Sequence, residues 1–527
     1  MSQKLDAIER TFFNKLFVSM AEEMGVTLAR TAYSPNIKER KDFSCAIFTP
    51  GGRLLAQAAH IPVHLGAMPL SVQSVLQRCP EMNPGDCYIV NDPFAGGTHL
   101  PDITLVSPVF DGHHLSGYLA TRAHHADVGG ISPGSLPIST SIYQEGFRVA
   151  PAKLTEEVIE LLCTNSRTPE ERRGDLRAQL AAHAVGEKRL LECVEKYERI
   201  RLTGIMDELL KYGRELMEHV VNQIPNGTYR FEDILDDDGV DASHIRIGLR
   251  LTIRGKRVTA DFTGSDPMVT GSLNAVEAIT RSAVYYCFLC LVVTPSRLHA
   301  SPLHNPPLNE GCFEVIKVVA PAGSVVNAVE PAAVAGGNVE TSQRIVDVVL
   351  GALSQALPDI IPAASQGTMN NVTLGGTDPH TGVPFAYYET IAGGMGARPD
   401  APGLSGVQVH MTNTLNTPVE AFEFAYPMRV TEYGIRRSSG GAGQQCGGDG
   451  IVRSIMVLTP AELTLLTERR TQQPYGLQGG SSGVSGYNAL CRNGRRKKLP
   501  GKICIGLKAG DVVTIRTPGG GGYGKAG

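Results

Sequence analysis

A predicted β-hairpin within residues 96–130 constrains the fold more than any other feature of the sequence. Asp111-Gly112 is a two-residue turn signal, and apolar residues alternate on both sides of it. The pattern therefore predicts antiparallel strands at about 103–110 and 113–124. Residues at one end of such a hairpin lie close together although they are far apart in the chain.

The hairpin register predicts which polar side chains meet at its open end. If Phe110 pairs with His113, then His99 lies opposite His124, and Asp102 is three residues away on the same end. Directly opposed residues have Cβ atoms about 4.5–5.5 Å apart, a separation that suits two ligands of one metal ion. The convergence of these three side chains survives a slip of two residues in the register.

This part of the chain is rich in histidine, since seven of the 14 histidines lie between positions 60 and 125. They are His60, His64, His99, His113, His114, His124 and His125. Two imidazoles and a carboxylate with open coordination positions suit Zn, Mn or Fe(II), which activate water or polarise a carbonyl. The alternative is that these are ordinary polar residues at a hairpin end.

Three more residues are candidates for the same site. Asp42, just before a predicted strand at 43–48, could add a second carboxylate to the metal. His125 and Asp127 follow His124 by one and three residues, so a strand end could point either one inward. We expect these two to support the metal ligands or to act as acid–base groups.

The rest of the chain predicts a multi-domain α+β protein. Residues 1–154 form the metal-binding α/β region, and 155–225 form a helical segment that ends at Pro225-Asn226-Gly227. Residues 226–450 form a central mixed α+β region, and 451–527 form a β-rich region. With 59 glycines and 33 prolines, the chain is loop-rich and does not fit a helical bundle.

Charge and hydropathy exclude several functional classes. The net charge of −3 does not fit a polybasic protein that binds nucleic acid or a membrane surface. The longest apolar run, residues 283–293, is far shorter than the roughly 20 residues of a membrane span, so we expect a buried core segment. No signal peptide is recognisable at the N-terminus, and the 11 cysteines fit reduced thiols, so we expect a cytoplasmic protein.

Residues 519–526 imitate two nucleotide-binding motifs. Gly519–Gly524 matches G-x-G-x-x-G, and the segment to Ala526 misses a Walker A motif by one residue. Both motifs require a helix whose N-terminus meets the phosphate, and too few residues follow here. The chain thus has no credible phosphate-binding loop, and any ATP must be bound by another polypeptide.

Two further segments have alternative interpretations. Residues 336–343 (GGNVETSQ) open a predicted helix, and their polar side chains either line the active site or cap the helix. Residues 408–414 (QVHMTNT) either hold substrate or a partner or have a structural role.

Several long blocks, at 39–72, 85–110, 122–137 and 447–455, resemble the hydantoinase B/5-oxoprolinase family. That family includes N-methylhydantoinase and caprolactamase β subunits and a related subunit of acetone carboxylases. The resemblance implies the same ligands, His99, Asp102 and His124, with Asp42 as a fourth. The chain lacks the additional length of the carboxylase subunits.

The resemblance also implies a function. Family members look like one half of a two-part enzyme that opens cyclic amides such as hydantoins, 5-oxoproline or lactams. The other half is an actin-like ATPase α subunit that binds ATP and Mg²⁺ and phosphorylates the substrate carbonyl oxygen. The implied assembly is an α2β2 heterotetramer, and this chain holds a divalent metal, Zn or Mn.

Three alternatives remain open from the sequence. One is a subunit of an ATP-dependent ketone carboxylase, a ligase that also activates a carbonyl. The second is a free-standing metallohydrolase, and the third is a non-catalytic partner whose metal is structural. Each predicts a different dependence of turnover on ATP, bicarbonate and the metal.

Overall fold

The computed structural model describes residues 5–58, 61–293 and 306–527, and it confirms a mixed α+β architecture with several sheets. The first sheet has the order β2 (Leu54–Gln57), β1 (Phe43–Phe48), β5 (His114–His124), β4 (Asp102–Asp111), β3 (Tyr88–Val90) and β6 (Ala152–Lys153). The second has the order β10 (Ile316–Val319), β9 (Arg257–Asp261), β8 (Ser243–Arg254) and β7 (Gly227–Asp237).

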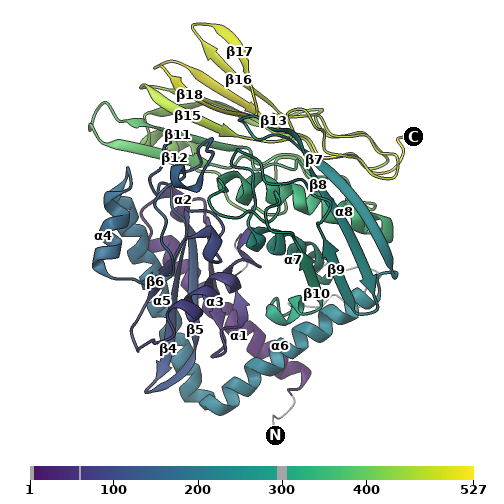
Figure 1. The fold of residues 1–527 in the computed structure, drawn as a ribbon. Helices are drawn as coiled ribbons and strands as arrows, with labels where there is room; N and C mark the ends of the chain where they lie inside the picture. The colour runs from purple at the N-terminus through teal and green to yellow at the C-terminus, as the bar shows by residue number, and fades with distance from the viewer. Residues whose placement is uncertain (1–4, 59–60, 294–305) are drawn as a thin grey trace.

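Two further sheets form the C-terminal part of the fold. One has the order β12 (Pro384–Glu389), β11 (Asn371–Thr377), β15 (Ala461–Leu466) and β18 (Lys502–Leu507). The other has the order β13 (Met428–Arg436), β14 (Gly450–Val457), β19 (Val512–Arg516), β16 (Tyr487–Arg492) and β17 (Arg495–Leu499). Figure 1 shows both at the top of the molecule, above the first and second sheets.

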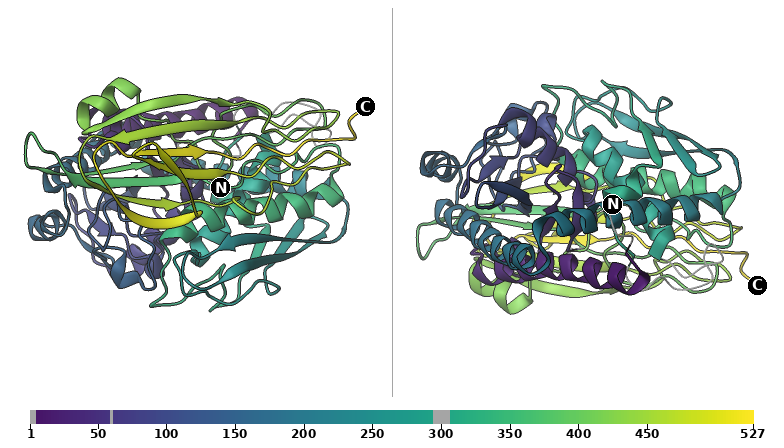
Figure 2. Two further views of the ribbon diagram at one scale, coloured as in Figure 1. Left: turned by 90° about the horizontal axis from the view of Figure 1, so that it is seen from above. Right: turned by 90° about the horizontal axis from the view of Figure 1, so that it is seen from below.

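The helices cover the faces of these sheets. They are α1 (Ala7–Thr31), α2 (Pro35–Lys38), α3 (Met68–Arg78), α4 (Glu156–Thr164), α5 (Pro169–Tyr197), α6 (Arg199–Asn222), α7 (Glu277–Val293), α8 (Ser342–Ala356) and α9 (Val419–Ala425). Helices α1 and α5 pack on the first sheet, and α8 packs on the second. Viewed from below, the long helices α1, α5 and α6 lie across the base of the molecule (Figure 2).

Helix α7 contains the apolar run that the sequence predicts as buried core. Most of its side chains, including Val284 and Phe288, are buried in the largest hydrophobic cluster. Among the described residues, no helix is both long and apolar enough to cross a membrane.

The predicted hairpin forms, but its register differs from the predicted one. Asp111 pairs with His114, and an irregularity between Val109 and Phe110 then shifts the register along the rest of the hairpin. Asp102, rather than His99, therefore lies directly opposite His124. The shift has two physical causes. The two-residue loop is Gly112-His113 rather than Asp111-Gly112, and the β-bulge then adds an extra residue, which a count from the turn alone cannot include.

The two C-terminal sheets combine strands from both sides of residue 450. Strands β11 and β12 pair with β15 and β18, and β13 pairs with β14. A boundary at that position would divide both sheets, so the division of the chain into four regions stays a prediction.

Close packing of backbone against backbone explains why residues 519–524 are rich in glycine and so resemble a nucleotide-binding loop. These residues run as extended chain between the stretches 394–408, 439–448 and 474–484. The backbone N–H of every residue from 519 to 524 donates to a carbonyl of a neighbouring stretch. Chains this close leave no room for side chains, so glycine here serves packing.

We expect Gly520→Ala to destabilise the fold by more than about 3 kcal/mol. An added Cβ would lie 2.1 Å from the Met395 carbonyl oxygen, and the surrounding backbone cannot move without breaking its hydrogen bonds. Denaturant unfolding measures the loss. Gly506→Ala on β18 is the control, because a Cβ there meets no atom within 4 Å. Equal stabilities of the two variants would contradict the packing argument.

Candidate metal centre

Three side chains converge at the open end of the β4–β5 hairpin. The Nε2 atom of His99 lies 3.2 Å from Asp102 Oδ1 and 3.2 Å from His124 Nδ1. His124 Nδ1 in turn lies 3.2 Å from Asp102 Oδ1. All three side chains are buried, and among the described residues they form the one group whose ligand atoms lie together as a metal site requires.

The triangle of donor atoms has the dimensions of a metal site. Nitrogen and oxygen ligands about 2.0–2.2 Å from a tetrahedral zinc ion lie roughly 3.3–3.6 Å from one another. The observed separations of 3.2 Å are close to that range. The arrangement fits a divalent ion with one face open.

Local structure fixes the orientation of each donor. Thr98 Oγ1 donates to Asp102 Oδ2 at 2.6 Å, which leaves Oδ1 directed at the two histidines. His99 Nδ1 lies 3.3 Å from the Ala335 carbonyl oxygen, so that nitrogen donates and Nε2 carries the lone pair of the neutral ring. The His124 ring stacks on Tyr388 at a centroid distance of 4.6 Å.

The electrostatics favour a charged carboxylate in the centre. Burial by itself would raise the pKa of Asp102, but the charge of His99 and the hydrogen bonds from His124 and His64 hold it well below its usual range. Burial would lower the pKa of His99, but the Asp102 carboxylate raises it. For His124, burial lowers the pKa and favours the neutral ring, which is the form that binds metal.

Asp42 lies near the site but is not among the converging donors. Its backbone carbonyl accepts from the His124 N–H at 2.9 Å, and its carboxylate lies 3.9 Å from Arg40 Nη2. Its negative charge favours the protonated form of both His99 and His124, and for His124 it only partly opposes the lowering of the pKa by burial. Its assignment as a fourth ligand stays a prediction.

The two candidate acid–base residues have partners elsewhere. His125 Nε2 lies 3.0 Å from Gln179 Oε1 on α5, and burial lowers the pKa of this histidine to about 4. Asp127 accepts hydrogen bonds from the backbone N–H of Gly129, Gly134 and Arg167, and it pairs with the Arg167 guanidinium at 3.0 Å. These bonds anchor a loop, and a catalytic role for either residue stays a prediction.

Sequence reasoning missed several residues around the triad. His64 lies 3.6 Å from Asp102 Oδ2 and is held by Ser44, 2.9 Å from its Nδ1. Asn338 Nδ2 lies 3.1 Å from His99 Nε2. The histidine count included His64 and the GGNVETSQ segment included Asn338, but neither signal identified the contact. His60 lies outside the described residues.

A buried glutamate supports the triad from behind. Glu145 Oε1 accepts from the backbone N–H groups of Val334 and Ala335 at 2.9 and 3.0 Å, and it so holds in place the residue whose carbonyl faces His99. Burial raises the pKa of Glu145 to about 7. No local sequence signal connects it with a residue about 190 positions away.

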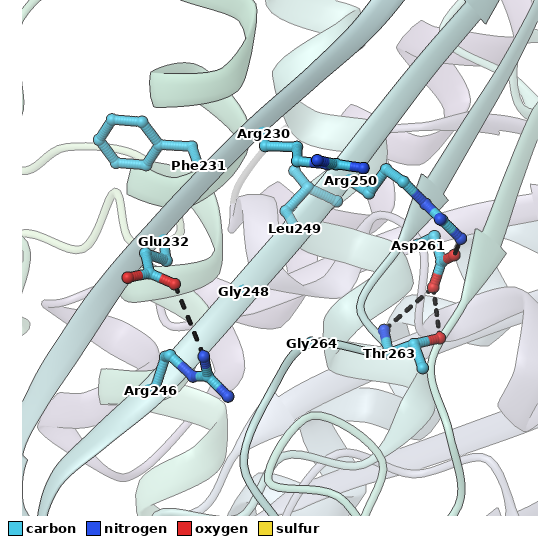
Figure 3. Close-up of a pocket in the computed structure, with 10 residues that line it drawn as sticks. All are labelled: Arg230, Phe231, Glu232, Arg246, Gly248, Leu249, Arg250, Asp261, Thr263 and Gly264. Atoms are coloured by element: carbon cyan, nitrogen blue, oxygen red, sulfur yellow. Dashed lines mark hydrogen bonds and ion pairs between the residues drawn. The ribbon is translucent and has the colours of Figure 1, made fainter.

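A pocket of about 500 Å³ is lined by residues of β7, β8 and β9 and of the turn after β9. Figure 3 shows its lining side chains. Two of its three arginines are matched by carboxylates, since Arg246 lies 3.8 Å from Glu232 and Arg250 pairs with Asp261. It shares no residue with the triad. The side chains that could bind a metal ion lie instead in the buried triad.

Comparisons with known proteins show the family and agree with this fold. Residues 6–526 match the hydantoinase B/oxoprolinase family. The chain is 42% identical to 5-oxoprolinase 1 of Arabidopsis thaliana over 99% of its own length and 42% of that protein. It is 29% identical to a putative D-/L-hydantoinase subunit of Pseudomonas sp. strain NS671, covering 99% of this chain and 90% of that one.

A solved structure gives the same result. The ATP-dependent caprolactamase of Pseudomonas jessenii superimposes with a TM-score of 0.90 at 27% identity, covering 99% of this chain and 92% of that one. The fold and the triad together define a mixed α+β protein with a buried two-histidine, one-carboxylate centre. The chain belongs to the hydantoinase B/oxoprolinase family. It spans about two fifths of the length of its 5-oxoprolinase relative.

Proposed function

We propose that this chain is the metal-containing subunit of an ATP-dependent cyclic-amide hydrolase. The observation that carries the proposal is the buried triad of His99, Asp102 and His124, with donor atoms 3.2 Å apart. The family and the relatives named oxoprolinase, hydantoinase subunit and caprolactamase support the same class of reaction.

The chemistry requires activation of the substrate. An unstrained cyclic amide resists hydrolysis because resonance stabilises its carbonyl. Phosphorylation of the carbonyl oxygen by a partner creates an imidate-like electrophile. A divalent ion, Zn or Mn, would lower the pKa of water and so supply a nucleophile near neutral pH.

This chain's own residues would hold and orient the centre. The three triad side chains would bind the ion, with Asp42 close enough to add negative charge. Thr98 and the Ala335 carbonyl would keep the Asp102 and His99 donors in place. Burial would exclude bulk water, which protects a phosphorylated intermediate from unproductive hydrolysis.

A partner completes the proposal. We infer an ATPase α subunit of the hydantoinase A type, with ATP and Mg²⁺ bound there, in an α2β2 heterotetramer. The relative named as a hydantoinase subunit supports a multi-subunit enzyme. In the longer 5-oxoprolinase relative, the length that this chain does not span leaves room for the ATPase part.

The test is a product analysis of the metal-loaded chain combined with such an ATPase subunit. We expect ATP-dependent ring opening of a hydantoin, 5-oxoproline or a lactam, with one oxygen from ¹⁸O-labelled water in the new carboxylate. Labelled bicarbonate should stay out of the product. Fixation of bicarbonate into a ketone would instead assign the chain to the carboxylase alternative.

A further inference from the structure

Asn338 presents a buried amide group beside the triad. Its Nδ2 atom lies 3.1 Å from His99 Nε2, and its Oδ1 atom has no hydrogen-bond partner among the described residues. The side chain is only 4% exposed. A buried amide with an unpaired oxygen is uncommon in a native protein and requires an explanation.

The backbone holds Asn338 firmly in this position. It lies in a single π-helical turn, Gly337–Thr341, directly before α8, and such turns are frequent at functional sites. The preceding Gly337 lies so close to Asn274 that an added Cβ would be 2.0 Å from the Asn274 carbonyl oxygen. The amide therefore cannot withdraw by a shift of the chain.

Metal binding would break the hydrogen bond between the Asn338 amide and His99. The Nε2 atom of His99 has one lone pair, which cannot bind an ion and accept from Asn338 at once. With the ion in place, both ends of the Asn338 amide would face the site unpaired. Leaving two buried polar groups unpaired is costly, so a bound ligand is expected to satisfy them.

The chemistry of a carboxamide indicates which ligand this is. Asn338 offers an acceptor oxygen and a donor NH₂ side by side. A ring of five to seven members holds its amide in the cis form, so its N–H and C=O project from one edge. The two edges match in a pair of parallel hydrogen bonds, as asparagine pairs with the adjacent donor and acceptor of adenine.

We propose that Asn338 binds the amide edge of the substrate ring and selects cyclic amides that carry a free N–H. This inference rests on the proposed function, because it takes the substrate to be a cyclic amide next to the metal. Oδ1 accepts from the ring N–H, which the O-phosphorylated ring keeps in its N-protonated form, and Nδ2 donates to the ring oxygen. Alkylation of the ring nitrogen removes the first bond and places a methyl group against Oδ1.

The test uses the full chain loaded with Mn²⁺, whose paramagnetism shortens the relaxation times of ring protons that bind beside it. The probes are 2-pyrrolidone and N-methyl-2-pyrrolidone. We expect the unsubstituted ring to bind about tenfold more tightly, the effect of one lost hydrogen bond that leaves a buried group unpaired. Asn338→Ala should abolish that preference and keep a full complement of metal.

Two further variants are included, one as a substitute for Asn338→Ala and one as a control. Asn338→Leu keeps most of the side-chain volume and removes both polar ends, so it substitutes for the alanine variant if that one folds poorly. Asn488→Ala removes another buried amide, one that is bonded to Thr467 and Arg470 within the C-terminal part, and should keep the preference.

The other possible results of this experiment would contradict the proposal in different ways. Equal binding of the two rings by the unaltered chain, or a preference that survives in both Asn338 variants, would overturn the assignment. Loss of metal from folded Asn338 variants would make the residue a metal ligand instead. Absence of relaxation with either ring would overturn this inference, whereas the proposed function is decided separately by the product analysis with the partner.

Discussion

Replacing His99 with alanine is expected to remove the metal and to abolish turnover. His99 contributes one of three donor atoms, and the remaining pair, Asp102 and His124, cannot hold an ion tightly. Loss of a residue that only supports a ligand typically costs 10–100-fold in metal affinity or activity. Loss of the ligand should therefore lower turnover more than about a hundredfold.

The measurement is metal content by mass spectrometry after dialysis, together with turnover in the presence of the partner. His183→Gln is the matched control. His183 is also buried, but its ring nitrogens bond to Ser107 and Thr121 and not to the triad. The control should keep its metal. Full occupancy in the His99 variant would refute the assignment of the centre.

The same variant separates a catalytic metal from a structural one. If the ion only stabilises the fold, His99→Ala should unfold the chain, and replacements of His125 and Asp127 should leave turnover unchanged. The environment of the triad favours a catalytic ion. Its three donors leave a face open, whereas structural zinc sites are usually closed by four protein ligands.

The sequence allowed the triad to be predicted because the interaction that forms it is local. A two-residue turn and two alternating strands bring His99, Asp102 and His124 together within 26 residues. The displaced turn and the bulge near Val109 together shifted the register from the predicted one, but all three residues lie at the same hairpin end. The predicted convergence of the three side chains therefore holds in spite of the error in the register.

The surroundings of the triad could not be predicted in this way. Ala335, Asn338 and Tyr388 come from segments more than 200 residues beyond the hairpin. Their positions depend on how the segment before α8 and strand β12 approach the hairpin end, which no periodicity encodes. The same holds for residues 519–524, where glycine spacing imitates a phosphate loop but serves close packing of four chain segments.

We expect the isolated chain to bind no ATP and to open no ring. A phosphate loop needs free backbone N–H groups at a helix N-terminus. In Gly519–Gly524 every backbone N–H is already bonded to a carbonyl. In the segment that most resembles a nucleotide site by sequence, the backbone N–H groups are thus used within the fold and are not free to bind a phosphate.

Turnover should appear only when the ATPase partner is added. The phosphorylated intermediate must pass from the partner to the buried triad without reaching bulk water. Such transfer requires a lasting interface, and permanent complexes bury more than about 2,000 Å². We expect the two chains to co-elute at low micromolar concentration, and ring opening to require both chains and ATP.

Calorimetric titration with ATP and Mg²⁺, followed by a lactam or hydantoin assay with and without the partner, measures both parts of this prediction. The His99→Ala chain is the matched control, because it should still bind the partner through its unaltered surface while ring opening is lost. That result would locate ATP binding on one chain and hydrolysis on the other. Tight ATP binding by this chain, or turnover without the partner, would instead establish a free-standing enzyme. The amide would in that case be activated without a second subunit.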